Sequence, residues 1–310
     1  MSASKSFVLL GHPVGHSVSP AIHGAAYRAL GWPHRYSVVD CPDEAEVRAQ
    51  VARVRSGELA GANVTVPWKR LAHALADRLD PSAAATGVVN VLYLDPEQRL
   101  VGANTDALAL VDEIEALHPS ARSAAVIGAG GAAQAAVVAC RTLELEPVLL
   151  SSRGYRLEEG RRLEDARSSW PHRAEFEALG ASLLGWPANE RDRRREVLAG
   201  RLPEVDVIVQ ATSAGMHGAG PGEAVSEWIP WRELRPGAVA LDVVYNPPRT
   251  PFLEAARRAG VPAAGGLGML VRQAAAAIRI WLGNEPGFRE PDLGVLLSAA
   301  EQALARARHA

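Results

Sequence analysis

Short apolar runs alternate with longer segments that are apolar at helical spacing along the first third of the chain. Runs of four to six apolar residues have the length of buried strands, whereas apolar positions three or four residues apart indicate helices. The predicted elements are strands at 6–11, 35–40 and 61–66, a helix at 19–30, and a hairpin of 85–94 with 99–105 that turns at Asp95 and Pro96. Alternation of this kind indicates parallel sheets covered by helices.

The rhythm changes after residue 107 to strand, glycine turn and helix, which is typical of a nucleotide-binding domain. The predicted elements are helices at 105–117 and 266–283, a strand–turn–helix unit at 123–143, and strands at 146–153, 205–213 and 237–245. We expect two α/β domains: an open α/β domain at 1–107 plus 262–310, and a Rossmann-type domain at 108–261. The helix at 266–283 should pack back on the first domain.

Composition narrows the class of protein. A chain of 310 residues exceeds one ordinary domain, and 48% hydrophobic with 22% charged residues is a globular balance. A net charge of -2 argues against nucleic acid or an anionic membrane as partner. Cys41 and Cys140 lie too far apart for a metal motif, so we expect no metal and a reducing compartment. The N-terminus has too short an apolar run for a signal peptide, which favours a cytoplasmic protein.

Residues 156–201 are rich in arginine and glutamate. Acidic residues are interleaved throughout, so a charged surface helix or an insertion is favoured over a nucleic-acid site.

The stretch VIGAGGAA at 126–133 fits G-x-G-x-x-A through Gly128, Gly130 and Ala133. The first glycine permits a tight turn, the second lets backbone approach a pyrophosphate, and the small third residue allows close packing of helix on strand. Its place between a predicted strand and helix favours a dinucleotide site over a purely structural turn. No acid occupies 147–157, the region that holds the ribose in NAD sites, whereas Arg153 suits a 2′-phosphate and favours NADP.

Several polar residues of the first domain have two interpretations. Ser17 and Ser19 precede a helix; Ser19 with Pro20 is favoured as a helix cap, and the alternative is a pair of hydroxyls that holds a carboxylate. Asn90, within an apolar predicted strand, is either a satisfied buried amide or a site residue. Asp106 or Thr105 is either a helix cap or a carboxylate at the mouth of a cleft.

Lys69 is the least expected of these polar residues. In NVTVPWK, alternation places Asn63 and Thr65 on one face of the strand, and Val64 with Val66 on the core face. The following proline predicts a helix start, so Lys69 would lie in a first helical turn, where a cation is electrostatically unfavourable. It is either a tolerated surface charge or a placed acid–base group.

The motifs resemble those of the shikimate dehydrogenase family. They are GHPVGHSVSPAIH, GANVTVPWK, GVVN, GANTD, VIGAGGA, ATSAGM, DVVYNPPRTPFL and GLGMLVRQA, in the family's order from residue 11 to about 282. NVTVPxK followed by NTD is more specific to this family than the glycine turn. The family reduces the ketone of 3-dehydroshikimate to shikimate with NADPH, on the path to the aromatic amino acids.

The resemblance implies roles for individual residues. Lys69 and Asp106 match the catalytic pair. Substrate would contact Ser17, Ser19, Thr65, Asn90, Tyr245 and Gln273, with the two serines on its carboxylate. The cofactor would contact Gly128, Ala129, Gly130, Gly131, Ala132, Ser152, Arg153 and Thr212, with Val243, Gly266 and Met269 near the nicotinamide end.

The chain departs from the family pattern at several positions. Asp106 is followed by Ala107 where the family commonly has glycine, and Gln210 stands where the family commonly has the asparagine of NATS. Arg156 lies one place out of register with the family's second basic residue.

The implied function is NADP-dependent reversible reduction of 3-dehydroshikimate, by a monomer or homodimer, with Lys69 and Asp106 acting as a coupled acid–base pair. The alternatives are a quinate or shikimate dehydrogenase that uses NAD, a sensor that binds shikimate-like acids without turnover, and another NADP-linked reductase such as a methylene-folate dehydrogenase. A methylene-folate dehydrogenase would not need a serine pair that holds a carboxylate.

Overall fold

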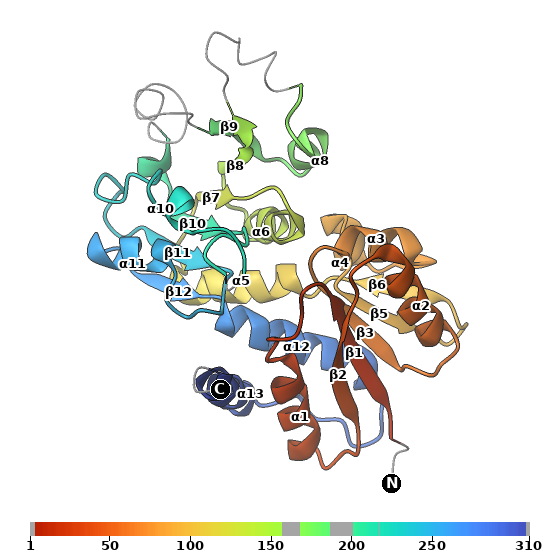
Figure 1. The fold of residues 1–310 in the computed structure, drawn as a ribbon. Helices are drawn as coiled ribbons and strands as arrows, with labels where there is room; N and C mark the ends of the chain where they lie inside the picture. The colour runs from red at the N-terminus through yellow and green to blue at the C-terminus, as the bar shows by residue number, and fades with distance from the viewer. Residues whose placement is uncertain (1–3, 157–167, 187–200, 217, 308–310) are drawn as a thin grey trace. The chain divides into compact units, whose positions relative to one another are not determined.

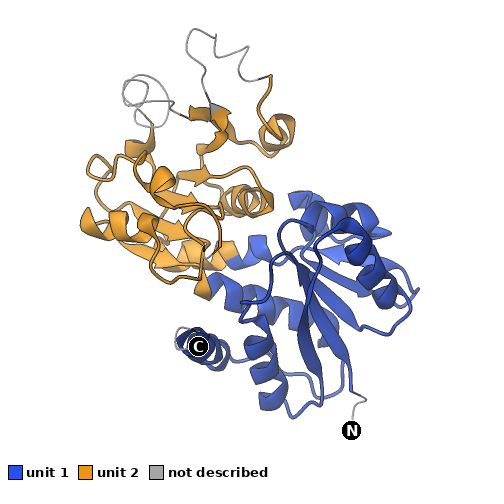
Figure 2. Ribbon diagram, viewed as in Figure 1, with its two compact units in different colours: residues 1–109, 268–310 blue, residues 110–267 orange. Residues whose placement is uncertain are grey.

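The computed structural model describes residues 4–156, 168–186, 201–216 and 218–307 (Figure 1). The chain divides into two compact units, residues 1–109 with 268–310 and residues 110–267 (Figure 2). The chain therefore enters the second unit at residue 110 and returns to the first unit at residue 268. Among the described residues, no helix is long and apolar enough to cross a membrane.

The first unit is built on a six-stranded sheet in the order β2-β1-β3-β5-β6-β4. The strands β1, β2 and β3 are parallel, whereas β5 runs antiparallel to both β3 and β6, as the predicted hairpin requires. Its elements are β1 (Ser6–Gly11), α1 (Ser19–Ala29), β2 (Arg35–Asp40), α2 (Glu44–Arg55), β3 (Gly61–Val64), α3 (Lys69–Leu75), β4 (Arg78–Leu79), α4 (Pro81–Thr86), β5 (Val91–Leu94), β6 (Leu100–Ala103), α12 (Leu267–Leu282) and α13 (Leu293–Ala307).

The second unit holds a parallel six-stranded sheet in the order β12-β11-β10-β7-β8-β9. The strand order reverses between β7 and β10, as in a doubly wound dinucleotide-binding domain. Its elements are α5 (Asp106–Leu117), β7 (Ala124–Ile127), α6 (Gly131–Thr142), β8 (Val148–Arg156), α8 (Arg173–Ala178), β9 (Ser182–Trp186), the 3-10 helix η1 (Leu202–Glu204), β10 (Val207–Gln210), α10 (Glu223–Ser226), β11 (Val239–Asp242), α11 (Pro251–Arg258) and β12 (Ala263–Gly265).

The helix α12 packs on the first sheet, as the sequence predicts. The Trp281 ring stacks on Phe7 with centroids 4.6 Å apart, and its indole N–H donates to the Leu92 carbonyl at 3.2 Å. A side chain at Gly61 would collide with this ring, so the strand has glycine where the indole crosses it. The terminal helix α13, which the sequence analysis did not predict, lies against α1.

Several predicted boundaries were wrong, and the short helix α4 was not predicted. Pro67 lies in a turn and α3 begins at Lys69; residues 81–86 are helical; Asn90 precedes β5 rather than lying in it. The strand β3 ends at Val64, so the alternation stops there and Val66 is 56% exposed rather than in the core.

The charged segment 156–201 is not simply an insertion. Residues 182–186 form an edge strand paired with β8, and Trp170 stacks on Tyr155 with centroids 4.7 Å apart. Residues 157–167 and 187–200, where most of the charge lies, fall outside the described residues.

Candidate active site and cofactor-binding turn

The structure joins Lys69 and Asp106 in an ion pair. The Lys69 ammonium donates to Asp106 Oδ2 at 2.6 Å, and the two side chains are only 15% and 7% exposed. Lys69 opens α3 and Asp106 opens α5, so residues 37 positions apart in sequence meet at two helix starts. A nearly buried ammonium–carboxylate pair requires its partners to be held in place, since either charge alone is costly there.

The turn Val88–Asn90 holds both members of the pair. The Val89 N–H donates to the Lys69 carbonyl at 3.1 Å, and the Asn104 amide donates to the Val88 carbonyl at 3.1 Å. Asn90 Oδ1 accepts the Thr105 N–H at 2.8 Å, while its amide nitrogen donates to the Thr105 hydroxyl at 3.0 Å. Three consecutive residues therefore fix the backbone beneath the ion pair.

Asn104 caps the helix that carries Asp106. Its Oδ1 accepts the N–H groups of Asp106 and Ala107 at 3.0 and 3.2 Å. The interpretation of Thr105 or Asp106 as the cap is therefore wrong, and the sequence analysis missed Asn104, although an Asn two residues before a helix is a recognisable cap signal. The Asp106 carboxylate is left for Lys69.

Ser19 does not cap α1. Val18 occupies the cap position and makes no side-chain bond, while the Ser17 hydroxyl accepts the Ser19 N–H at 3.2 Å and donates to the Ser19 hydroxyl at 3.1 Å. The favoured cap interpretation is therefore wrong, because Ser19 lies one residue inside the helix. Two hydroxyls side by side at a helix start suit an anion.

Thr65 lies beside the loop that carries these serines. Its backbone N–H donates to the Leu10 carbonyl at 2.8 Å, and the His12 N–H donates to the Val66 carbonyl at 3.0 Å. A side chain at Gly11 would collide with the Thr65 methyl group. The carboxyl ends of the parallel strands β1 and β3 thus bring these segments together, at the edge where α/β sheets bind ligands.

Gln273 is half-buried on α12 of the same unit, where its amide donates to the Leu270 carbonyl at 2.8 Å. Tyr245 is half-buried in the second unit, after β11. Met269 is 8% exposed on α12.

The glycine turn between β7 and α6 has the geometry of a dinucleotide cradle. Gly128 has φ +141, and a side chain there would come within 2.6 Å of the Ala211 carbonyl oxygen. At Gly130 a Cβ would meet nothing within 4 Å, so the backbone is open to a ligand. No side chain caps the N–H groups at the start of α6, and Ala133 is fully buried against the strand. These features fit a pyrophosphate.

Five other predicted cofactor residues lie in or after neighbouring strands of the same sheet. Ser152 and Arg153 lie just beyond the last residue of β8 that pairs with β7, and Arg153 is exposed. Thr212, Val243 and Gly266 follow β10, β11 and β12. All five therefore come from the carboxyl edge of the second sheet, where the strand order favours a nucleotide.

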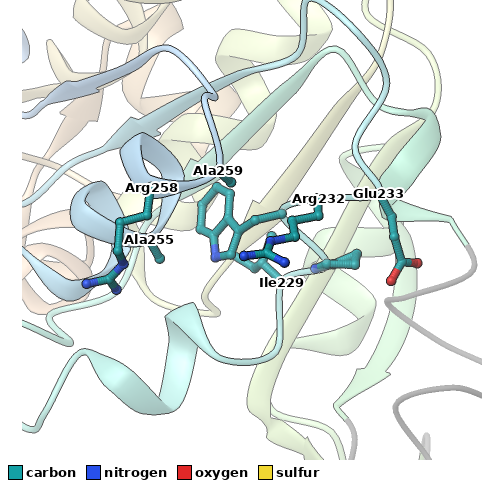
Figure 3. Close-up of a pocket in the computed structure, with 8 residues that line it drawn as sticks. Ile229, Arg232, Glu233, Ala255, Arg258 and Ala259 are labelled. Carbon is teal, nitrogen blue, oxygen red and sulfur yellow. The ribbon is translucent and has the colours of Figure 1, made fainter.

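A separate pocket of the second unit has a volume of about 350 Å³ (Figure 3). It is lined by Ile229, Pro230, Trp231, Arg232, Glu233, Ala255, Arg258 and Ala259. None of these is a predicted site residue, so the pocket contributes nothing to the site described above.

Comparisons with known proteins agree with the motifs. The family model described as shikimate dehydrogenase substrate binding domain matches residues 9–92, and that described as shikimate 5′-dehydrogenase C-terminal domain matches residues 266–290. A Citrifermentans bemidjiense protein named shikimate dehydrogenase (NADP(+)) is 36% identical over 281 residues, covering 90% of each chain. One of the same name from Rubrobacter xylanophilus is 36% identical over 283 residues, again covering 90% of each.

A solved structure extends the likeness to the fold. The shikimate 5-dehydrogenase of Thermus thermophilus, crystallised with NADP(H) and shikimate, is 31% identical to this chain. The two structures match with a TM-score of 0.75, over 97% of this chain and 100% of that one. The resemblance in the motifs and the two-domain fold class are thus confirmed. The chain belongs to the shikimate dehydrogenase family.

Proposed function

We propose that this chain catalyses the reversible NADP-dependent reduction of 3-dehydroshikimate to shikimate. The observation that carries the proposal is the 2.6 Å ion pair of Lys69 and Asp106, since a binder without turnover needs no acid–base pair in a nearly buried site. The relatives that bear this activity in their names support the substrate and the cofactor.

Reduction of a ketone leaves an oxyanion that must receive a proton, and bound NADPH would supply the hydride. Lys69 has three N–H donors, of which one is directed to Asp106, so it can donate a second hydrogen bond to the carbonyl oxygen. In the reductive direction Lys69 is the general acid, and in the oxidative direction it is the general base. Asp106 orients the ammonium and shares its proton.

We assign the other residues by their positions. Ser17 and Ser19 hold the substrate carboxylate at the start of α1, while Thr65, Asn90, Gln273 and Tyr245 contact its hydroxyls. Asn90 uses its amide oxygen and one amide hydrogen on Thr105, which leaves one amide hydrogen for a hydroxyl. The segment 1–107 with 262–310 would be the substrate domain and 108–261 the cofactor domain.

We assign the cofactor to the second sheet. The backbone from Gly128 to Ala132 would hold the pyrophosphate, and Arg153 with Ser152 the 2′-phosphate. Thr212, Val243, Gly266 and Met269 would lie near the nicotinamide. An exposed arginine in place of an acid favours NADP over NAD.

The test is steady-state turnover of the purified protein with shikimate or quinate, each paired with NADP or NAD. We expect the highest kcat/KM with shikimate and NADP. Absence of turnover in all four combinations, with shikimate and NADPH still bound, would replace the proposal by a sensor; quinate with NAD as the best pair would replace the substrate and cofactor assignments.

We further propose a cytoplasmic location and a monomeric or homodimeric state. Both cysteines are free and buried, which suits a reducing compartment. Light scattering during size-exclusion chromatography of the purified protein measures the oligomeric state, and a tetramer would contradict the proposal of a monomer or homodimer.

A further inference from the structure

A carboxylate is buried in the second unit, where β11 ends, and no described cation pairs with it. Asp242 is 0% exposed, as are Gln210, its register partner on β10, and Thr250, which follows in the next loop. Asp242 Oδ1 accepts the Val244 N–H at 3.0 Å and the Gln210 amide at 3.3 Å, and Oδ2 accepts the Thr250 hydroxyl at 2.5 Å. Three donors from three segments therefore converge on one side chain.

Gln210 extends this network into the loop after β10. Its Oε1 accepts the Thr212 N–H at 2.5 Å, and its amide nitrogen also donates to the Ala214 carbonyl at 3.1 Å. The family commonly has asparagine at this position, whose side chain is shorter by one methylene. The longer glutamine can bond residues 212 and 214 of its own loop and still contact Asp242.

The backbone next to Asp242 is fixed from both neighbouring strands. The Val243 N–H donates to the Gln210 carbonyl at 3.0 Å, and the Gly266 N–H donates to the Val244 carbonyl at 3.1 Å. A side chain at Gly266 would collide with the Val243 carbonyl, so only glycine permits this approach. Val243 and Gly266 are two of the residues proposed to face the nicotinamide.

Thr250 anchors the far end of the loop. Its oxygen accepts the Leu253 N–H at 3.2 Å and so caps α11 while its hydroxyl hydrogen goes to Asp242. Gly215 and Gly222, from the loop after β10, lie against Pro251, with Cβ positions 3.4 and 2.9 Å from its ring. The loops after β10 and β11 are thus joined to each other at both ends.

We propose that Asp242 is a positioning residue for the nicotinamide end of the cofactor: through Gln210 and Thr250 it fixes the segments 211–214 and 243–250. This inference rests on the cofactor assignment made above. A carboxylate suits the position because it only accepts hydrogen bonds, and three donors point at it. Without it, buried donors on both loops would be left unpaired, and the loops would move to reach water.

The test separates the nicotinamide end from the adenosine end. Dissociation constants are measured for NADPH and for adenosine 2′,5′-bisphosphate, which lacks the nicotinamide, on the wild type, Gln210→Met, Thr250→Val and Thr250→Ser. Methionine keeps the length of glutamine without its hydrogen bonds, valine keeps the shape of threonine without its hydroxyl, and serine restores that hydroxyl. Melting temperatures report whether each variant folds.

Gln210→Met loses three side-chain hydrogen bonds and Thr250→Val loses two. We expect each variant to weaken NADPH binding at least about tenfold and to leave bisphosphate binding unchanged. Thr250→Ser should bind both ligands like the wild type. Equal losses for the two ligands, or no loss for either in the variants that fold, would overturn the inference.

The outcome is independent of turnover. If the wild type binds NADPH but does not oxidise shikimate, the proposed reaction fails while the positioning role can still be tested. If the wild type binds neither ligand, the cofactor assignment and this inference fail together.

Discussion

Removing Lys69 alone should cost more stability than removing both members of the Lys69–Asp106 pair. At 2.6 Å and an effective dielectric constant of about 20, the attraction is about 6 kcal/mol, which the desolvation of both charges offsets in the folded protein. A single substitution removes the attraction but leaves one charge desolvated.

The two single substitutions should differ. Lys69→Met leaves a carboxylate that is 7% exposed, and we expect a loss of about 3 kcal/mol in the free energy of unfolding. Asp106→Asn leaves an ammonium on a side chain that is 15% exposed and long enough to reach water, so we expect a loss of about 1 to 2 kcal/mol. The double variant has no unpaired charge and should lose about 1 to 2 kcal/mol, well below the sum.

The assay is urea unfolding at pH 7, followed by tryptophan fluorescence, on the wild type and the three variants. In parallel, each variant should lower kcat with shikimate and NADP by about a thousandfold, and the losses should not multiply because the two residues act as one unit. Additive stability losses would refute the coupling, and an unchanged kcat in Lys69→Met would remove this residue from the mechanism.

Three further predictions concern the glycines and the buried carboxylate. Gly128→Ala should lower the melting temperature, because φ is +141 and the new methyl group would lie 2.6 Å from a carbonyl oxygen; Gly130→Ala should leave it unchanged and weaken NADPH binding. Gly61→Ala should displace the Trp281 ring and lower the unfolding free energy by about 2 kcal/mol, as overpacking does. Burial raises the pKa of Asp242 from 3.8 to about 6. Its contribution to the free energy of unfolding is therefore complete below pH 3.8 and is lost as the pH rises through 6. Relative to Asp242→Asn, the wild type should lose about 1 kcal/mol of unfolding free energy between pH 5 and 7.

The controls are internal to each comparison. Equal melting temperatures of Gly128→Ala and Gly130→Ala in thermal scans would contradict the prediction for the glycine turn. For the strand glycine, unchanged unfolding in urea would mean that the indole moves without cost. For the carboxylate, whose hydrogen-bond partners are all uncharged, parallel stability profiles of wild type and Asn variant over that pH range would show that its pKa is not raised by burial.

The sequence predicted the glycine turn with most certainty because its signal is local. Gly128, Gly130 and Ala133 lie within six residues, and each has a steric reason that one strand–turn–helix unit satisfies. The capping residues were harder. Ser19 and Asp106 are residue types that often cap helices, and both lie at helix starts. In the structure Val18 occupies the cap position of α1, and the Asn104 side chain caps α5. A shift of one or two residues in a helix start changes which side chain meets the free N–H groups.

The sequence alone determined the alternation of strands and helices, the two-domain class and the residues proposed to react, since these depend on periodicity and on motifs of a few residues. Only the tertiary structure decided which distant groups meet. Lys69 reaches Asp106 because the Val88–Asn90 turn bonds to both of their segments, and Asp242 joins two loops because β10 and β11 are neighbours in register. Such contacts depend on which strands pair, and pairing is set by the packing of the whole sheet rather than by any local pattern.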